Sequence, residues 1–151
     1  SIDGIETTIG ADCTPYLIAN SEIVFGVNYV YQNSPAQKAG LKRGDIILDV
    51  NGKIYNSTNY KEFYYQKNPM KISIGILDGK TIIKTENTIE ITPVKMTLDP
   101  IICTSIIDLG TKKVGYLAYD NFTSDTENLK QVFGEFKDNK ISFEISSTCR
   151  I

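Results

Sequence analysis

The chain has 151 residues, of which 41% are hydrophobic, and a formal net charge of −2. This length suits one full domain, or one small domain with part of another. Charges of both signs are interspersed without a basic stripe, so nucleic acid is not an expected partner, because phosphate binding needs clustered Lys and Arg. No apolar run is long enough to span a membrane, and Ser1 to Gly10 lacks the basic and apolar regions of a signal peptide. We therefore expect either a cytosolic chain or the mature part of an exported protein.

The residues that commonly hold metals or act as catalytic bases are few. The sequence has no histidine, and its three cysteines, Cys13, Cys103 and Cys149, are far apart. Zinc sites need ligands at short spacings such as Cys-x-x-Cys, and a Ser-His-Asp triad needs an imidazole. We therefore predict no metal site, no cofactor and no imidazole-based catalysis, and we interpret the cysteines as free, partly buried thiols.

The first fifty residues predict strands joined by one short helix. Glu22–Tyr31 is the clearest strand, because Ile23, Phe25 and Val27 alternate with residues of the opposite face. The other elements expected here are an extended segment over 5–18 with Gly10 in its middle, a short helix over 35–39 and a strand over 45–50.

Residues 56–93 predict one longer helix and further strands. Asn56, Ser57 and Thr58 favour a helix start, and Asn68-Pro69 ends the helix expected over 59–66. Asp78-Gly79 predicts a hairpin turn between strands. These strands are expected over 71–77 and 80–84, with a further extended piece over 86–92 that Pro93 closes.

From residue 94 the pattern becomes that of the start of an α/β unit. The segment 94–107 is apolar and rich in threonine, and 113–119 predicts a strand. Ser124 and Glu127 form a capping box. The helix that follows has an apolar face made by Leu129, Val132, Phe133 and Phe136. A helix of this kind needs other elements to cover that face.

Residues 34–52 carry the most informative motif. Ser34 can cap a helix, Pro35 suits its first position, and Gly40 can end it. The whole run resembles the SPA-x-x-AGL-x-x-GD-x-I-x-x-(V/I)-NG signature of bacterial PDZ domains. The resemblance implies that residues 1–93 form a PDZ domain, with a mainly β fold that includes α (α+β). Its architecture is expected to be a partly open β-barrel with two helices.

The PDZ resemblance also implies a groove that binds extended peptide C-termini. Such a groove adds a ligand strand to a sheet edge beside a helix, and backbone N–H groups receive the ligand carboxylate. Its candidate residues are Ile9, Gly10, Ala11, Asp12, Cys13, Tyr60 and Tyr64. The alternative is that the aromatic residues among them pack in the interior, as we expect for Phe63. Since Ile9, Ala11, Tyr60 and Tyr64 carry no charge, we expect apolar ligand side chains.

The second segment resembles the opening of the catalytic domain of carboxyl-terminal processing (tail-specific) serine peptidases. The resemblance rests on the residues of 113–119 and on Phe122, Thr123, Leu129, Val132, Phe133 and Phe136. It implies that 94–151 is an N-terminal fragment of that domain, an incomplete α/β segment. The family's Asp-Leu-Arg and Gly-Gly elements and its Ser-Lys catalytic dyad are not found here. We therefore assign no catalytic residue and expect this chain to be inactive alone.

The predicted function is peptide C-terminus binding for substrate recognition and gating in such a peptidase of the periplasm or cell envelope. The alternative is a non-catalytic PDZ adaptor. Two other protease classes are less favoured. Trypsin-like periplasmic proteases place the catalytic domain before the PDZ domain, and intramembrane metalloproteases need membrane spans. The expected partners are peptide or unfolded protein C-termini.

Overall fold

The computed structural model describes residues 5–119 and 127–141. The chain divides into two compact units, a first unit that ends at Leu98 and a second unit that begins at Asp99. The sequence pattern predicts the boundary between the two segments after residue 93. In the part of the chain that the structure describes, no helix has the length and apolar character needed to cross a membrane.

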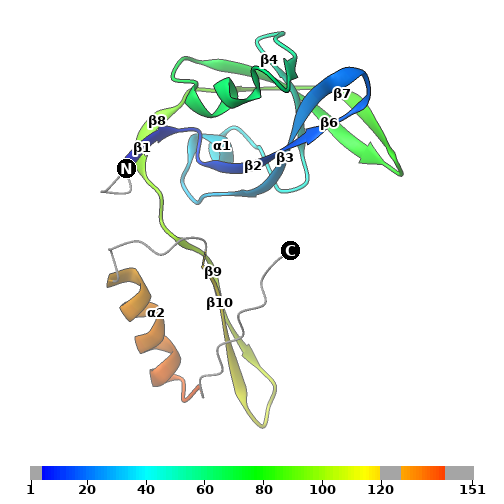
Figure 1. Ribbon diagram of the computed structural model, residues 1–151. Coiled ribbons are helices and arrows are strands. Elements are labelled where there is room, and N and C mark those ends of the chain that lie inside the picture. The colour runs from blue at the N-terminus through cyan, green and yellow to red at the C-terminus, as the bar shows by residue number, and fades with distance from the viewer. Residues whose placement is uncertain (1–4, 120–126, 142–151) are drawn as a thin grey trace. The chain divides into compact units, whose positions relative to one another are not determined.

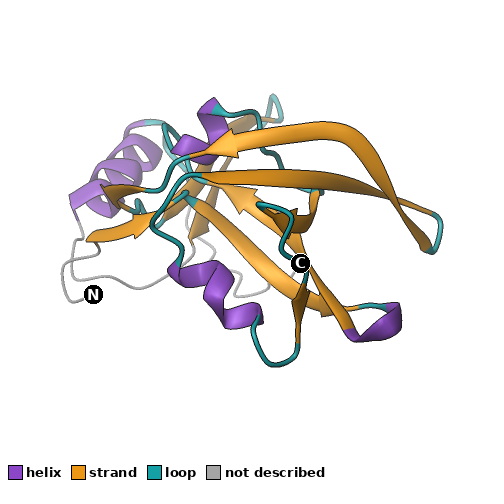
Figure 2. Ribbon diagram, turned by 90° about the horizontal axis from the view of Figure 1, so that it is seen from above, coloured by secondary structure: helices purple, strands orange, loops and turns teal. Residues whose placement is uncertain are grey.

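The first unit is built on an open antiparallel sheet, shown in Figures 1 and 2. Its strand order is β2-β3-β4-β6-β7, and the short β5 also pairs with β3. A separate two-stranded sheet joins β1 to β8, segments far apart in the sequence. The bounds are β1 Ile5–Thr8, β2 Ala11–Leu17, β3 Glu22–Val30, β4 Ile46–Val50, β5 Tyr55–Asn56, β6 Met70–Asp78, β7 Thr81–Ile91 and β8 Val94–Thr97. The predicted PDZ-like α+β fold is confirmed, with an open sheet rather than a closed barrel.

The helices of the first unit are short. Helix α1 (Pro35–Lys38) begins as predicted, because the Ser34 hydroxyl accepts a hydrogen bond from the Gln37 amide at 3.1 Å. The helix predicted over 59–66 is a 3-10 helix, η2 (Tyr60–Tyr65). Six residues rich in aromatic side chains have too few hydrogen bonds to favour a regular α-helix. A second 3-10 turn, η1 (Ala19–Ser21), joins β2 to β3.

The core of the first unit is aromatic at its centre. Phe25 of β3 is fully buried, and its ring stacks on Phe63 of η2 with a centroid distance of 4.1 Å. Tyr55 lies edge-to-face against Phe25 at 5.3 Å. Ile47 and Ile72, on the neighbouring strands β4 and β6, are also fully buried. The aromatic stack therefore fixes η2 beneath the sheet.

Strand β7 differs from its predicted form. The two expected pieces, 80–84 and 86–92, make one continuous strand paired with β6. The register shifts between Ser73 and Gly75, and there the Thr85 hydroxyl donates a 2.8 Å hydrogen bond to the Ile74 carbonyl. A side-chain hydrogen bond thus fills the gap that a bulge leaves in the ladder.

The described residues of the second unit form a hairpin and one helix, seen together in Figure 1. Its strands are β9 (Ile101–Asp108) and β10 (Lys113–Tyr119), and its helix is α2 (Glu127–Asp138). Val132 and Phe136 are buried on one face of α2 together with Ile141. This is the apolar face that the helical spacing predicts, whereas Ser124 of the predicted capping box lies outside the described residues.

Candidate functional site

The seven predicted groove residues lie in two segments that the structure brings together. Ile9 to Cys13 form the loop after β1 and the beginning of β2, while Tyr60 and Tyr64 belong to η2. The Tyr64 hydroxyl donates a 3.0 Å hydrogen bond to the backbone carbonyl of Cys13. The helix and the strand are therefore neighbours, with Tyr64 bridging them.

The loop before β2 is held by backbone hydrogen bonds on two sides. The Ile9 carbonyl accepts from the Ala36 amide at 2.9 Å, and the Gly10 carbonyl accepts from the Tyr31 amide at 2.9 Å. The Gly10 amide donates to the Thr8 hydroxyl at 3.1 Å. These bonds fix the loop between α1 and the end of β3.

Gly10 is required by both conformation and space. Its φ of +73° is left-handed, and a Cβ added there would lie 2.3 Å from the Ser34 Cβ. Ser34 is fully buried and caps α1. The close approach of the loop to the helix start thus links Gly10 to the motif of residues 34–52.

Strand β2 has one open edge. It pairs with β3, and no other strand of the described residues pairs with it. The Gly10 carbonyl and the Ile18 amide bond toward β3. The backbone N–H and C=O groups of successive residues point to opposite sides of a strand. Those of Ala11, Cys13 and Pro15 therefore point to the open edge. A proline at such a position is typical of edge strands, because it has no N–H to donate.

The two faces of β2 differ in character. The Cys13 side chain is buried in the core, and Ala11 packs against that core. Asp12 and Thr14 lie on the other face, where the Asn28 side-chain amide donates to the Asp12 carboxylate at 2.6 Å and to the Thr14 hydroxyl at 2.9 Å. The core side of the edge strand is therefore uncharged, whereas its other side carries the Asp12 carboxylate.

The aromatic residues of η2 divide between core and edge. Phe63 is buried, as expected, and Tyr60 packs partly against the core. Tyr64 is 44% exposed, with its ring edge-to-face against Phe25 and Phe63. The Ile9 side chain also belongs to the core, so only the backbone of Ile9 is available at the surface of the loop.

Two titratable groups at this edge stay neutral at ordinary pH. Burial, with a smaller contribution from nearby Asp12, raises the pKa of the Cys13 thiol to about 12. Partial burial, with nearby Cys13 and Asp12, raises the pKa of Tyr64 to about 12. Tyr64 therefore keeps its proton and acts as a hydrogen-bond donor.

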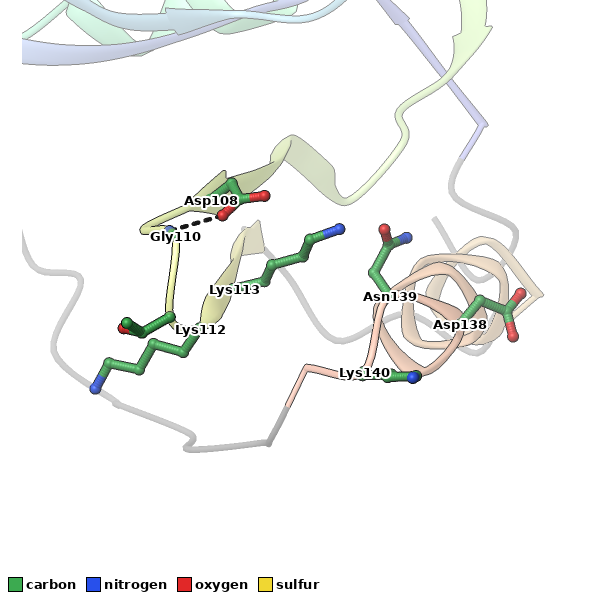
Figure 3. A pocket seen from close by; sticks show the side chains of 8 residues that line it. Asp108, Gly110, Lys112, Lys113, Asp138, Asn139 and Lys140 are labelled. Carbon is green, nitrogen blue, oxygen red and sulfur yellow. Dashed lines mark hydrogen bonds between the residues drawn. The ribbon is translucent and has the colours of Figure 1, made fainter.

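The second unit also has a cavity of about 440 Å³ (Figure 3). It lies between the β9–β10 turn and the end of α2. Figure 3 shows that Lys113 extends toward Asn139 while Lys112 points away, so the charged groups do not converge on one point. The lining residues are Asp108, Gly110, Thr111, Lys112, Lys113, Asp138, Asn139 and Lys140.

The comparisons with known proteins agree with the geometry of the first unit. A family model described as PDZ domain matches residues 26–58. The matched residues lie within the first unit, whose fold is PDZ-like. No match was found among curated proteins.

Two solved structures share the fold of the chain. A protein designated an S41 protease from Bacteroides fragilis has a TM-score of 0.65 and 24% identity, with 91% of this chain covered. The photosystem II D1 C-terminal processing protease has a TM-score of 0.59 and 17% identity over the same share. The chain spans 41% and 38% of the length of those two proteins.

Sequence reasoning missed two residues that shape the open edge of β2 and the loop before it. The Thr8 hydroxyl accepts the hydrogen bond of the Gly10 amide. The signal for this in the sequence was a threonine two residues before a glycine, which has a left-handed backbone here. Pro15 leaves the edge of β2 without an N–H, and a proline inside a predicted strand indicates an edge position.

Proposed function

We propose that the PDZ domain binds the free C-terminus of an extended peptide, which adds as a strand to the open edge of β2. The observation that carries this proposal is the position of that edge between the Gly10 loop and η2. Strand addition at a sheet edge obtains affinity from main-chain hydrogen bonds. The peptide carboxylate then lies at the successive N–H groups of Ile9, Gly10 and Ala11.

The carboxylate takes the place of the Thr8 hydroxyl at the Gly10 amide. That amide now donates to a neutral oxygen at 3.1 Å. A charged carboxylate is a stronger acceptor than a hydroxyl. The exchange therefore favours a free acid over an amidated terminus, which carries no charge.

We further propose that this binding serves substrate recognition and gating in a C-terminal processing serine peptidase of the periplasm or cell envelope. The shared fold over 91% of the chain supports it, as does the name of the D1 processing protease. In this proposal, residues 94–151 are the beginning of the catalytic domain. The proposal assigns no catalytic role to any residue of this chain.

The test is an NMR titration of the full chain with one acetylated hexapeptide that ends in Leu-Ala-Ala, as free acid and as C-terminal amide. We expect saturable shifts of the Gly10, Ala11 and Cys13 amides with the acid, and a Kd on the order of micromolar or weaker because a flexible peptide loses entropy on binding. Gly79, in the β6–β7 turn, is the internal control and should not shift. Equal shifts with acid and amide, or none with either, would contradict the proposal.

A further inference from the structure

Asp12 places a carboxylate beside the open edge of β2, on the side of the strand that faces away from the core. Its neighbours in the strand, Ala11 and Cys13, pack against the core or within it. Asp12 itself is only partly buried. The edge therefore has an apolar side and a charged side, and the side chains of a ligand strand would meet both in alternation.

A β-bulge holds this carboxylate in place. The register of β2 with β3 shifts between Asp12 and Cys13, so that Asn28 is left as the extra residue of β3. The Asn28 side-chain amide donates a 2.6 Å hydrogen bond to the Asp12 carboxylate. A hydrogen bond to a charged acceptor is stronger than one between neutral groups. The carboxylate is therefore ordered before a ligand binds, which lowers the entropy that binding costs.

The Asp12 carboxylate has no cation beside it in the part of the chain that the structure describes. The ion pairs found there join other residues, namely Lys53 with Glu62, Lys84 with Asp49 and Lys130 with Glu127. The Asn28 hydrogen bond engages one of the two carboxylate oxygens, Oδ2. A cation on a ligand can therefore pair with Asp12 without breaking any of these ion pairs.

The proposed strand addition fixes which ligand residue faces Asp12. Because the peptide carboxylate lies at the Gly10 loop, where β2 begins, the peptide runs antiparallel to β2. Its terminal residue then lies opposite Ala11, its penultimate residue opposite Asp12 and its third residue from the end opposite Cys13. Directly opposed residues of an antiparallel pair share one face of the sheet, with Cβ atoms about 4.5–5.5 Å apart. A long basic side chain at the penultimate position therefore reaches the carboxylate.

We infer that the groove selects peptides whose penultimate residue is lysine or arginine, and that Asp12 sets this preference. The inference rests on the proposed function and narrows the substrate class of the same site. It adds a basic residue on the outer side of the ligand to the apolar side chains expected on the core side. An acidic penultimate residue is disfavoured, because like charges directly opposite each other on neighbouring strands repel.

Variants of the full chain test the role of Asp12. Asp12→Asn removes the charge and keeps an oxygen that can accept from Asn28, whereas Asp12→Lys reverses the charge. Asp78→Asn makes the same chemical change at the exposed end of β6, and is the matched control for the loss of one negative charge. Amide spectra that are unchanged away from β2 and β3, or away from the β6–β7 turn for the control, establish that each variant folds.

The experiment measures Kd for acetylated hexapeptide acids that differ only at the penultimate residue and end in Leu-Lys-Ala, Leu-Gln-Ala or Leu-Glu-Ala. Wild type and Asp78→Asn should bind the lysine peptide about 2- to 5-fold more tightly than the glutamine peptide, as expected for a cross-strand pair of opposite charge. The glutamate peptide should bind more weakly than the glutamine peptide. Asp12→Asn should abolish the preference for lysine, and Asp12→Lys should favour the glutamate peptide.

A second pair of peptides moves the same substitution to the third residue from the end. These peptides end in Lys-Leu-Ala and Gln-Leu-Ala. The exchanged side chain now lies on the uncharged core side of the edge, so wild type should show no preference for lysine. An equal preference for lysine at both positions overturns the inference, because it would reflect a general attraction of cationic peptides to a chain with a net charge of −2.

The remaining outcomes separate the inference from the proposed function. If wild type binds all the peptides without preferring lysine at the penultimate position, the inference is overturned and the proposed function stands. A preference that persists in Asp12→Asn also overturns the inference, since another residue then recognises the lysine. If wild type binds none of the peptides, the proposed function is overturned and the inference with it.

Discussion

Phe25 in the first unit and Phe136 in the second are both buried aromatic side chains, yet their surroundings differ. Phe25 belongs to a cluster of fifteen buried residues, whereas Phe136 shares its cluster with Val132 and Ile141 alone. These numbers refer to the described residues. The β9–β10 hairpin of the second unit also exposes apolar side chains, among them Ile107 in β9 and Leu109 in the turn, at 48% and 57%.

This difference indicates how much each unit can stabilise itself. Burial of apolar area supplies most of the favourable free energy of folding, and a cluster of three residues is small against the entropy of ordering a hairpin and a helix. The first unit has a core that can support a cooperative fold. The described part of the second unit has an apolar surface typical of a segment that packs against further structure.

The largest expected effect comes from removing the central aromatic residue of each unit. Phe25→Ala should destabilise the first unit by about 3–5 kcal/mol, because a buried ring is lost and a cavity remains. Phe136→Ala should leave the unfolding midpoint of the first unit unchanged. Both effects can be measured by thermal unfolding, monitored through the NMR signals of each unit separately.

The comparison would fail if Phe136→Ala lowered the midpoint of the first unit as much as Phe25→Ala does. The two units would then unfold as a single cooperative structure.

A smaller effect is expected at two left-handed glycines, one in each unit. A left-handed non-glycine residue costs about 1–2 kcal/mol, which applies to both Gly10→Ala and Gly110→Ala. Gly10 has φ +73° and no room for a Cβ beside Ser34, whereas Gly110 has φ +80° and nothing within 4 Å. Gly10→Ala should therefore be clearly more destabilising, as measured by denaturant unfolding of the unit concerned. Equal costs would show that the Gly10 loop can move away from Ser34.

The two described cysteines give the mildest test. Cys13 is buried with a pKa of about 12, while Cys103 is exposed. Since the thiolate is the reactive form, iodoacetamide at pH 8 should label Cys103 much faster than Cys13, as measured by mass spectrometry of peptides. Unfolding in guanidinium should remove the difference. Cys149 lies outside the described residues and serves as a third, separately identified peptide.

The raised pKa of Cys13 also predicts an alkaline effect. Below pH 9 the thiol is protonated in both the folded and the unfolded state, and its contribution to stability is fully present. Between about pH 9, its ordinary value, and about pH 12 the unfolded state ionises first, so stability decreases as pH rises. Cys13→Ala should reduce this slope in denaturant unfolding. An unchanged slope would contradict the assignment to Cys13.

The sequence by itself determined the features that depend on neighbouring residues. Ser34 and Pro35 begin α1 because capping is a local hydrogen bond. The Asp78-Gly79 turn lies between β6 and β7 as expected, and the apolar face of α2 follows from its spacing. The candidate binding residues around Gly10 come from a local pattern as well, a glycine between apolar residues before a strand, and their role in binding stays a prediction.

Only the tertiary structure decided how distant segments meet. The hydrogen bond from Tyr64 to Cys13 joins residues 51 positions apart, and the pairing of β1 with β8 spans most of the first unit. The hydrogen bond from Tyr64 depends on the stacking of Phe25 on Phe63, which sets the position of η2 against the sheet. Local propensity carries no information about that position, because it results from packing many side chains at once. The hydrogen bond from Tyr64 to the edge of β2 was therefore visible only in the folded chain.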